Sequence, residues 1–148
     1  MNTPVYDFLI QYAERDPVRL HMPGHKGRFG APALQRAMTL DLTEITGADS
    51  LFEAEGILAE SERNAASLYG TAYTFYSCGG STLCIQTMLL LMKQQGRAVL
   101  AARNVHRAFL NTCVLLDLPV QWIYPRESDG ILSGTYDLAD FEAALQQQ

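Results

Sequence analysis

Long apolar runs, an even set of cysteines and clustered basic residues are all missing from this sequence of 148 residues. Its longest apolar stretch, around Met88 to Met92, falls far short of the roughly 20 residues that span a bilayer, so we expect no membrane partner. Its three cysteines cannot all pair within one chain, and its amphipathic, acid-bearing N-terminus is unlike a secretory signal. Both features favour a cytoplasmic protein.

Charged residues are also scarce, at 18% of the sequence where about a quarter is usual. A larger than usual share of the surface is therefore expected to contact protein or ligand, which indicates an assembly. The formal net charge is -5, and the basic residues are scattered singly along the chain. Because no row of cations is available to neutralise a row of phosphates, we expect no nucleic-acid partner.

Helix-like and strand-like patterns alternate through much of the chain. An opening helix is expected after Thr3, which can cap it, and is expected to end before Pro17. Further helices are expected at residues 55–68, 81–95 and 105–116 and from 138 onward, and strands at residues 72–78, 98–102 and 120–124. This alternation predicts an α/β fold, in which helices cover a parallel sheet.

The predicted sheet has an open edge, and the last helix, capped by Asp137, has an apolar face that needs more sheet beneath it. We divide the chain into an N-terminal helical arm with an irregular loop, residues 1–54, and the first part of a larger domain, residues 55–148. On this interpretation the sheet is incomplete, and the larger domain is truncated at its C-terminal end.

The segment Gly79-Gly80-Ser81-Thr82 lies between a predicted strand and a predicted helix. Glycines that admit an anion, free N–H groups at a helix N-terminus and two hydroxyls together make a phosphate site. The same residues also make an ordinary turn with an ordinary helix cap. They match neither the dinucleotide motif G-x-G-x-x-G nor a P-loop, and the chain has no G-x-S-x-G nucleophile motif.

Three histidines and an acidic stretch are the other candidates. His106 follows a predicted strand at the sheet edge where ligands bind, and its ring is either a stacking surface or a plain cap. His21 and His25 have metal-pair spacing, but Pro23-Gly24 prevents a helix there, so we expect no metal. The acids between Asp41 and Glu55 either receive a cationic substrate or form a solvated surface.

Four segments, in this order, resemble the ornithine/lysine/arginine decarboxylase family. They are HMPGHKGR at 21–28, DLTEITGADSLFEAEGIL at 41–58, FYSCGGSTLCIQTML at 75–89 and AARNVHRAF at 101–109. The first resembles the family's Pro-Gly-His-Lys-Gly signature, the third its phosphate loop and the fourth its Asp-Arg-Asn-x-His-Lys-Ser segment. The resemblance runs from near residue 4 to the C-terminus.

The resemblance implies an enzyme that depends on pyridoxal 5'-phosphate (PLP), with the aspartate aminotransferase fold (fold type I) and a homodimeric or higher assembly. It implies decarboxylation of lysine, ornithine or arginine, a chemistry that PLP supplies. The implied cofactor-binding residues are Gly80, Ser81, Thr82 and His106, and the implied active-site loop is Pro23, Gly24, His25, Lys26 and Gly27.

The family's Schiff-base lysine lies in a Ser-x-His-Lys segment beyond the region matched here. Lys26 and Lys93 are the only lysines in the sequence, and neither is expected to replace it. We therefore expect an N-terminal fragment of the major domain, with no catalytic residue of its own and no activity in isolation. The alternatives are another fold type I PLP enzyme, such as an aminotransferase, and a non-catalytic remnant that pairs with a full-length subunit.

Overall fold

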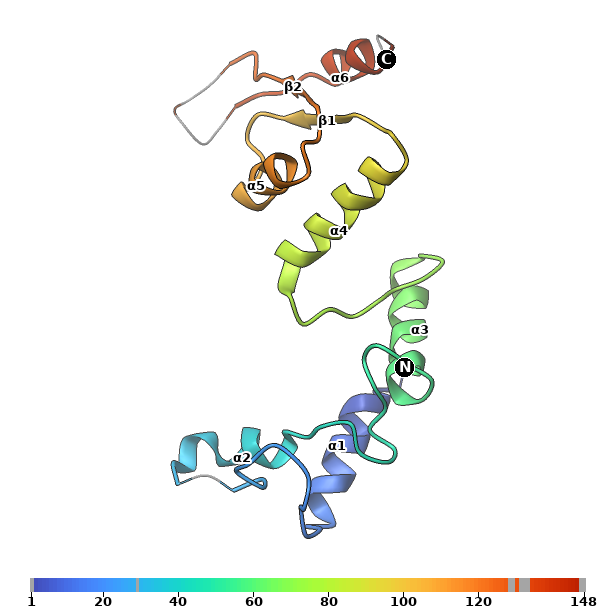
Figure 1. Ribbon diagram of the computed structural model, residues 1–148, viewed down its shortest axis with the longest axis vertical. Helices are drawn as coiled ribbons and strands as arrows, with labels where there is room; N and C mark the ends of the chain where they lie inside the picture. Colours follow the sequence, from blue (N-terminus) through green and yellow to red (C-terminus); the bar gives the residue numbers. More distant parts are fainter. Residues whose placement is uncertain (1, 29, 128–129, 131–133, 147–148) are drawn as a thin grey trace. The chain divides into compact units, whose positions relative to one another are not determined.

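The computed structural model describes residues 2–28, 30–127, 130 and 134–146. Its contacts divide the chain into two compact units, Met1–Tyr76 and Ser77–Gln148 (Figure 1). The first unit contains only helices among its described elements, and the second contains helices and a small parallel sheet. The chain thus contains both helices and strands, which agrees with the predicted α/β class.

Three helices form the first unit: α1 (Pro4–Glu14), α2 (Pro32–Leu40) and α3 (Ile57–Tyr69). Helix α1 packs against both α2 and α3. It begins after Thr3 as expected, but Thr3 does not cap it, because its hydroxyl donates to the carboxylate of Asp7 at 2.9 Å. Helix α2 was not expected, because the prolines and glycines before it favoured an irregular loop.

The second unit carries the elements α4 (Gly80–Gln94), β1 (Val99–Ala102), α5 (Arg107–Leu115), β2 (Val120–Ile123) and α6 (Leu138–Gln146). The two strands are parallel, in a register that runs from Val99 opposite Val120 to Ala102 opposite Ile123. Helix α5 connects them, as expected for a strand, helix and strand unit. The two strands and helices α4 and α5 confirm the prediction for this region, and Gly96, with a φ of +65°, follows α4.

A small core holds α4 and α5 together. Leu89 of α4, Cys113 of α5 and Leu118 are buried, and partly buried apolar side chains surround them. The side chains at residues 85 and 109 belong to this surround, and each lies in or just after the first turn of its helix. The core therefore packs α4 against α5, while the predicted cofactor residues at 80–82 and 106 are exposed outside it.

The predicted strand at residues 72–78 is wrong, since no strand occurs there. A strand needs a neighbour, and the chain at this point is bound to α3 instead. The backbone N–H of Tyr76 donates to the carboxylate of Glu62 at 2.8 Å, and the Tyr76 hydroxyl donates to the Ser61 carbonyl at 3.2 Å. Cys78, at the end of this segment, and Cys84, in α4, are exposed.

Candidate functional site

The predicted site residues fall into two groups, one in each unit. The active-site loop, residues 23–27, lies in the first unit, and the turn at residues 80–82 lies with His106 in the second. Within the second unit the turn and His106 precede the two helices that the core packs together, α4 and α5, and no hydrogen bond between described residues joins them. Each group is described by itself below.

The turn before α4 has the backbone geometry of an anion cradle. Gly80 has a φ of +65°, and a Cβ built on it would meet nothing within 4 Å, so the space in front of it is open. A Cβ on Gly79 would lie 2.6 Å from the Leu83 side chain, so only glycine fits there. The hydroxyl of Ser77 accepts from the Gly79 N–H at 3.1 Å and closes the turn.

The head of α4 also has the charge distribution that an anion requires. No side chain caps the helix, and no acidic residue lies in its first turn. The N–H groups of Ser81 and Thr82 therefore keep their hydrogen-bonding capacity, and the helix dipole places partial positive charge there. A phosphate group is the kind of ligand that this arrangement accepts, and both hydroxyls are exposed beside it.

His106 is the N-cap of α5, so it has the role of a helix cap, which was one of the two roles considered for it from the sequence. Its Nδ1 accepts from the backbone N–H of Ala108 at 3.1 Å. An accepting Nδ1 leaves the proton of the neutral ring on Nε2. The cap fixes the ring, and because the residue is exposed, the cap leaves it open to a flat ligand.

The segment before His106 is fixed by the single tryptophan of the chain. The guanidinium of Arg103 lies over the Trp122 ring at 5.0 Å from the centroid. Phe109, in the first turn of α5, meets the same ring edge-on with centroids 6.1 Å apart. Contacts on both sides of His106 thus converge on one side chain of β2.

The active-site loop holds His25 by both of its ring nitrogens. Nδ1 accepts from the backbone N–H of Gly27 at 3.0 Å, and Nε2 donates to the carboxylate of Asp41 at 3.1 Å. With Nδ1 accepting, the ring is not free to act as a base at that nitrogen. His25 is oriented by the loop and presents its faces and carbon edge to any ligand.

The ammonium of Lys26 donates to the carbonyl of His21, and that of Lys93 donates to the carbonyl of Leu116. His21 is also engaged. Its Nδ1 faces the Met22 carbonyl and must carry a proton, so its Nε2 accepts from the Tyr12 hydroxyl at 2.8 Å in the neutral ring. In the described part of the chain, no three His, Cys, Asp or Glu side chains are grouped to hold a metal ion.

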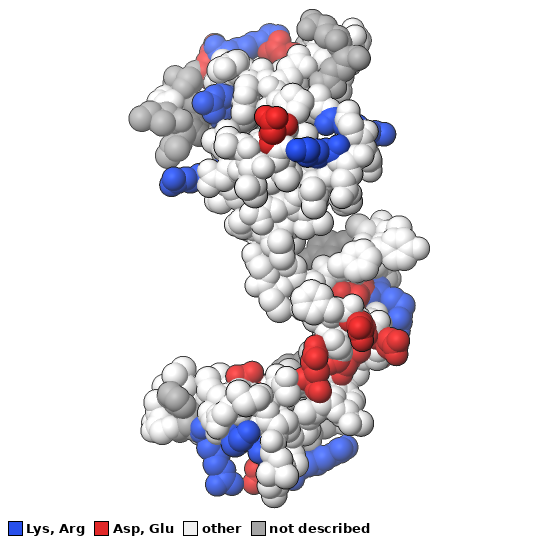
Figure 2. All heavy atoms as spheres, in the orientation of Figure 1, with Lys and Arg blue, Asp and Glu red and all other residues white. Residues whose placement is uncertain are grey.

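The acidic stretch fits neither of its two interpretations fully. Acidic side chains gather around the first turns of α3 and the segment before it (Figure 2). Of these, Asp49 accepts four backbone N–H groups, from Ser50, Glu55, Gly56 and Leu58, at 2.8 to 3.1 Å. Chiefly the bond from Glu55, together with the other three, lowers the pKa of Asp49 from 3.8 to about 2.

Asp49 therefore caps α3 from seven residues before the helix N-cap, which is Gly56. Neither this role nor that of Arg19, a buried cation beside the active-site loop, was predicted from the sequence. One signal for Asp49 was available. The predicted helix had glycine at its start, with no Ser, Thr, Asp or Asn to cap it, so its cap had to come from elsewhere.

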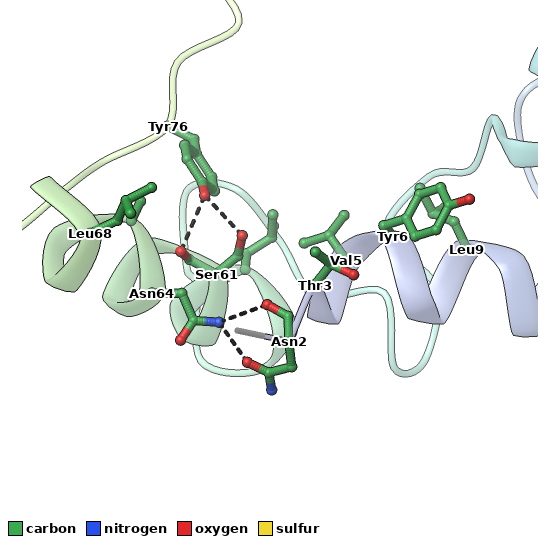
Figure 3. Close-up of a pocket in the computed structure, with 11 residues that line it drawn as sticks. Asn2, Thr3, Val5, Tyr6, Leu9, Ser61, Asn64, Leu68 and Tyr76 are labelled. Carbon is green, nitrogen blue, oxygen red and sulfur yellow. Dashed lines mark hydrogen bonds between the residues drawn. The ribbon is translucent and has the colours of Figure 1, made fainter.

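A groove with a volume of about 520 Å³ lies between α1 and α3 of the first unit (Figure 3). Its walls are mainly apolar, and none of the predicted site residues lines it. Its polar side chains bond one another, as when Asn64 donates to the side-chain oxygen of Asn2 at 2.9 Å. With no titratable group besides tyrosine, the groove offers no catalyst.

Comparisons with known proteins agree with the motifs. Residues 3–148 match the family model described as Orn/Lys/Arg decarboxylase, major domain, which confirms the resemblance. An arginine decarboxylase of Halalkalibacterium halodurans is 32% identical over 136 residues, which is 88% of this chain and 28% of that protein. An arginine decarboxylase of Bacillus subtilis is 32% identical over 129 residues, with 83% and 26% covered.

A lysine decarboxylase of Pseudomonas aeruginosa is 23% identical over 153 residues, with 93% of this chain and 20% of that protein covered. The chain thus spans about a quarter of the length of the curated relatives it matches. No helix in the described residues is both long and apolar enough to span a membrane.

Proposed function

The chain belongs to the Orn/Lys/Arg decarboxylase family, and from that premise we propose that it is the cofactor-anchoring part of a PLP-dependent decarboxylase of basic amino acids. The observation that carries the proposal is the open, uncapped turn at the head of α4. When bound, PLP supplies the electron sink for loss of carbon dioxide from the amino acid. Every other role below belongs to residues of this chain.

Gly80, Ser81 and Thr82 would hold the phosphate of PLP. Gly80 supplies the open approach, and Ser81 and Thr82 supply N–H groups and hydroxyls at the positive end of the helix. The structure fits this role, because the cradle lacks a competing side-chain cap and lacks a carboxylate in its first turn. A phosphate dianion is favoured there both by hydrogen bonds and by the helix dipole.

His106 would meet the pyridine ring of PLP through its face. The bond from Ala108 to Nδ1 restrains the imidazole plane, so less rotational freedom is lost when a ring stacks on it. His25 and the rest of the active-site loop, residues 23–27, would line the site in the full-length enzyme. This assignment rests on the family motif and on the ordered ring of His25.

We propose that neither lysine of the chain is the Schiff-base residue, because Lys26 belongs to the active-site loop motif and Lys93 lies in the last turn of α4, at the opposite end of that helix from the proposed phosphate cradle. We therefore propose that residues 1–148 alone do not decarboxylate lysine, ornithine or arginine. The substrate, a fold type I large domain that begins near residue 55, a homodimeric assembly and a cytoplasmic location are proposals for the full-length enzyme.

Exposed apolar side chains support the proposal of an assembly. Leu83, Met88 and Leu91 of α4 are each more than two-fifths exposed, although a helix in a finished α/β domain buries one face. In the full-length enzyme, further sheet or a second subunit would cover this surface. A non-catalytic chain that pairs with an intact subunit would use the same surface, and it differs from our proposal only in its biological role.

The proposal is tested by comparing PLP with pyridoxal, which lacks the phosphate. In equilibrium dialysis against the purified chain, PLP should bind at least about tenfold more tightly than pyridoxal, because the cradle contributes only to PLP. Inorganic phosphate should compete with PLP. Equal affinities, or release of carbon dioxide from a basic amino acid by the isolated chain with PLP, would contradict the proposal.

A further inference from the structure

Arg19 is a buried cation that none of the proposed roles uses. It is 9% exposed, and no carboxylate among the described residues forms an ion pair with it. Its guanidinium instead donates to the carbonyl of Thr39 at 2.6 Å and, more weakly, to that of Asp41 at 3.4 Å. It also lies over the Tyr12 ring, 5.1 Å from the centroid. Burying a charge without an ionised partner costs folding free energy, so the position of Arg19 requires a structural explanation.

The guanidinium of Arg19 also packs directly against the active-site loop. A Cβ built on Gly27 would lie 2.6 Å from Arg19 Cζ, and Gly27 is buried with a φ of +75°. No other residue type fits between the loop and the guanidinium at this position. Arg19 therefore packs against Gly27, the last residue of the active-site loop.

The two residues that hold His25, Gly27 and Asp41, are both among the residues that Arg19 contacts. Gly27 donates its N–H to Nδ1 of His25, and Asp41 accepts from Nε2 through its carboxylate. Arg19 packs on Gly27 and bonds the carbonyl of Asp41. Both anchors of the imidazole thus meet one planar cation.

We propose that Arg19 is the positioning residue for His25, fixing both the ring plane and the proton on Nε2. The inference rests on the proposed function in one respect, since it concerns a residue of the proposed active-site loop. Arg19 acts through Gly27 and Asp41 and does not itself touch a ligand. Its side chain thereby decides which edge of His25 the loop presents.

Long-range nitrogen NMR of the histidine rings in the purified chain tests this inference. In the unaltered chain at pH 8, His25 should carry its proton on Nε2, and the Gly27 amide should exchange slowly. In Arg19→Met, His25 should move to a mixture of tautomers. The Gly27 amide should exchange at least about tenfold faster, because the guanidinium that packs against Gly27 is lost. Arg36→Met, which alters an exposed arginine of the same unit, should change neither reading.

His106, in the other unit, is the internal standard, since its Nδ1 accepts from Ala108 and its tautomer should not change. Unchanged His25 nitrogen shifts and unchanged Gly27 exchange in folded Arg19→Met would overturn the inference. If Arg19→Met does not fold, Arg19→Lys is measured by the same two readings. Lysine keeps the charge but lacks the planar guanidinium, so His25 should again become a mixture of tautomers and the Gly27 amide should exchange faster. Readings equal to those of the unaltered chain would overturn the inference. No cofactor is added, so the outcome is independent of PLP binding.

Discussion

Single residues in this chain derive their roles from backbone groups that lie far along the sequence. Asp49 illustrates this, since its four N–H partners extend to Leu58, nine residues away. The bonds stabilise the ionised carboxylate, and its pKa falls to about 2 for that reason. Asp49 thereby couples the start of α3 to the pH of the solution.

The pH dependence has a definite sign. Because folding lowers the pKa of Asp49 from 3.8, its contribution to stability is fully present above that value and is lost as the pH falls toward about 2. Between pH 4 and pH 2, we expect Asp49→Asn to show a flatter fall in melting temperature than the unaltered chain. Circular dichroism at 222 nm, recorded as a function of temperature, measures this.

The control for Asp49 is Glu53→Gln, which alters an exposed acid of the same segment. It should follow the unaltered chain throughout this pH range. At neutral pH, Asp49→Asn should melt several degrees lower, because an amide has one acceptor oxygen where the carboxylate has two. Parallel melting curves for all three proteins from pH 4 to pH 2 would refute the assigned role of Asp49.

At the residue scale, the sequence predicted best those features that depend on neighbouring residues in the chain. A turn at Gly79 and Gly80 was predicted, and the space at Gly80 is open, while its role as a phosphate site stays a prediction. Arg19 could not be predicted, because its partners are carbonyls of residues 39 and 41 and a glycine of the loop. Backbone groups are the same in every residue, so they leave no sequence pattern.

At the scale of elements, prediction succeeded wherever a segment could satisfy itself locally. Helices α3 to α6 carry their own apolar stripes, and β1 and β2 have each other as partners. The segment at residues 72–78 has strand-like composition but no neighbouring strand, and it bonds α3 instead. Its failure shows that β-propensity describes fit to a sheet that must already be present.

Helix α6 allows a test of a predicted cap. Asp137 accepts from the N–H of Ala139 at 3.0 Å and also pairs with Arg126 at 2.7 Å. Asp137→Ala should destabilise α6 by about 1 kcal/mol, the usual cost of losing such a cap. Asp137→Ser keeps a capping oxygen but loses the charge, so it should recover most of that loss. Urea denaturation followed by circular dichroism measures both.

The comparison of the two variants separates capping from ion pairing. Arg126 retains Asp140 as a bidentate partner in either variant, with bonds of 3.0 and 2.8 Å, so it is not left alone. Equal destabilisation by Asp137→Ala and Asp137→Ser would mean that the ion pair, and not the cap, stabilises the end of this unit.

At the scale of the whole molecule, the family match and the structure describe different aspects of the chain. The match covers residues 3–148 and about a quarter of the length of the relatives. The structure supplies two units, each of which holds one group of the predicted site residues. The proposed role of the chain in anchoring PLP therefore requires that the second unit bind the phosphate by itself.

Two glycines at opposite ends of α4 give a matched test of that claim. Gly80 and Gly96 each have a φ of +65° with open space where a Cβ would be, so alanine imposes a similar backbone strain at either position. Only Gly80 lies in the proposed phosphate cradle. The difference between the two variants thus isolates the cradle from the general cost of strain.

The most direct measurement is the affinity of the chain for PLP, determined by equilibrium dialysis for the unaltered protein, Gly80→Ala and Gly96→Ala. We predict that Gly80→Ala weakens PLP binding at least about tenfold relative to Gly96→Ala, because it closes the approach to the helix N-terminus. Pyridoxal should not distinguish the two variants. Equal PLP affinities for Gly80→Ala and Gly96→Ala would contradict the central claim that the head of α4 anchors the cofactor.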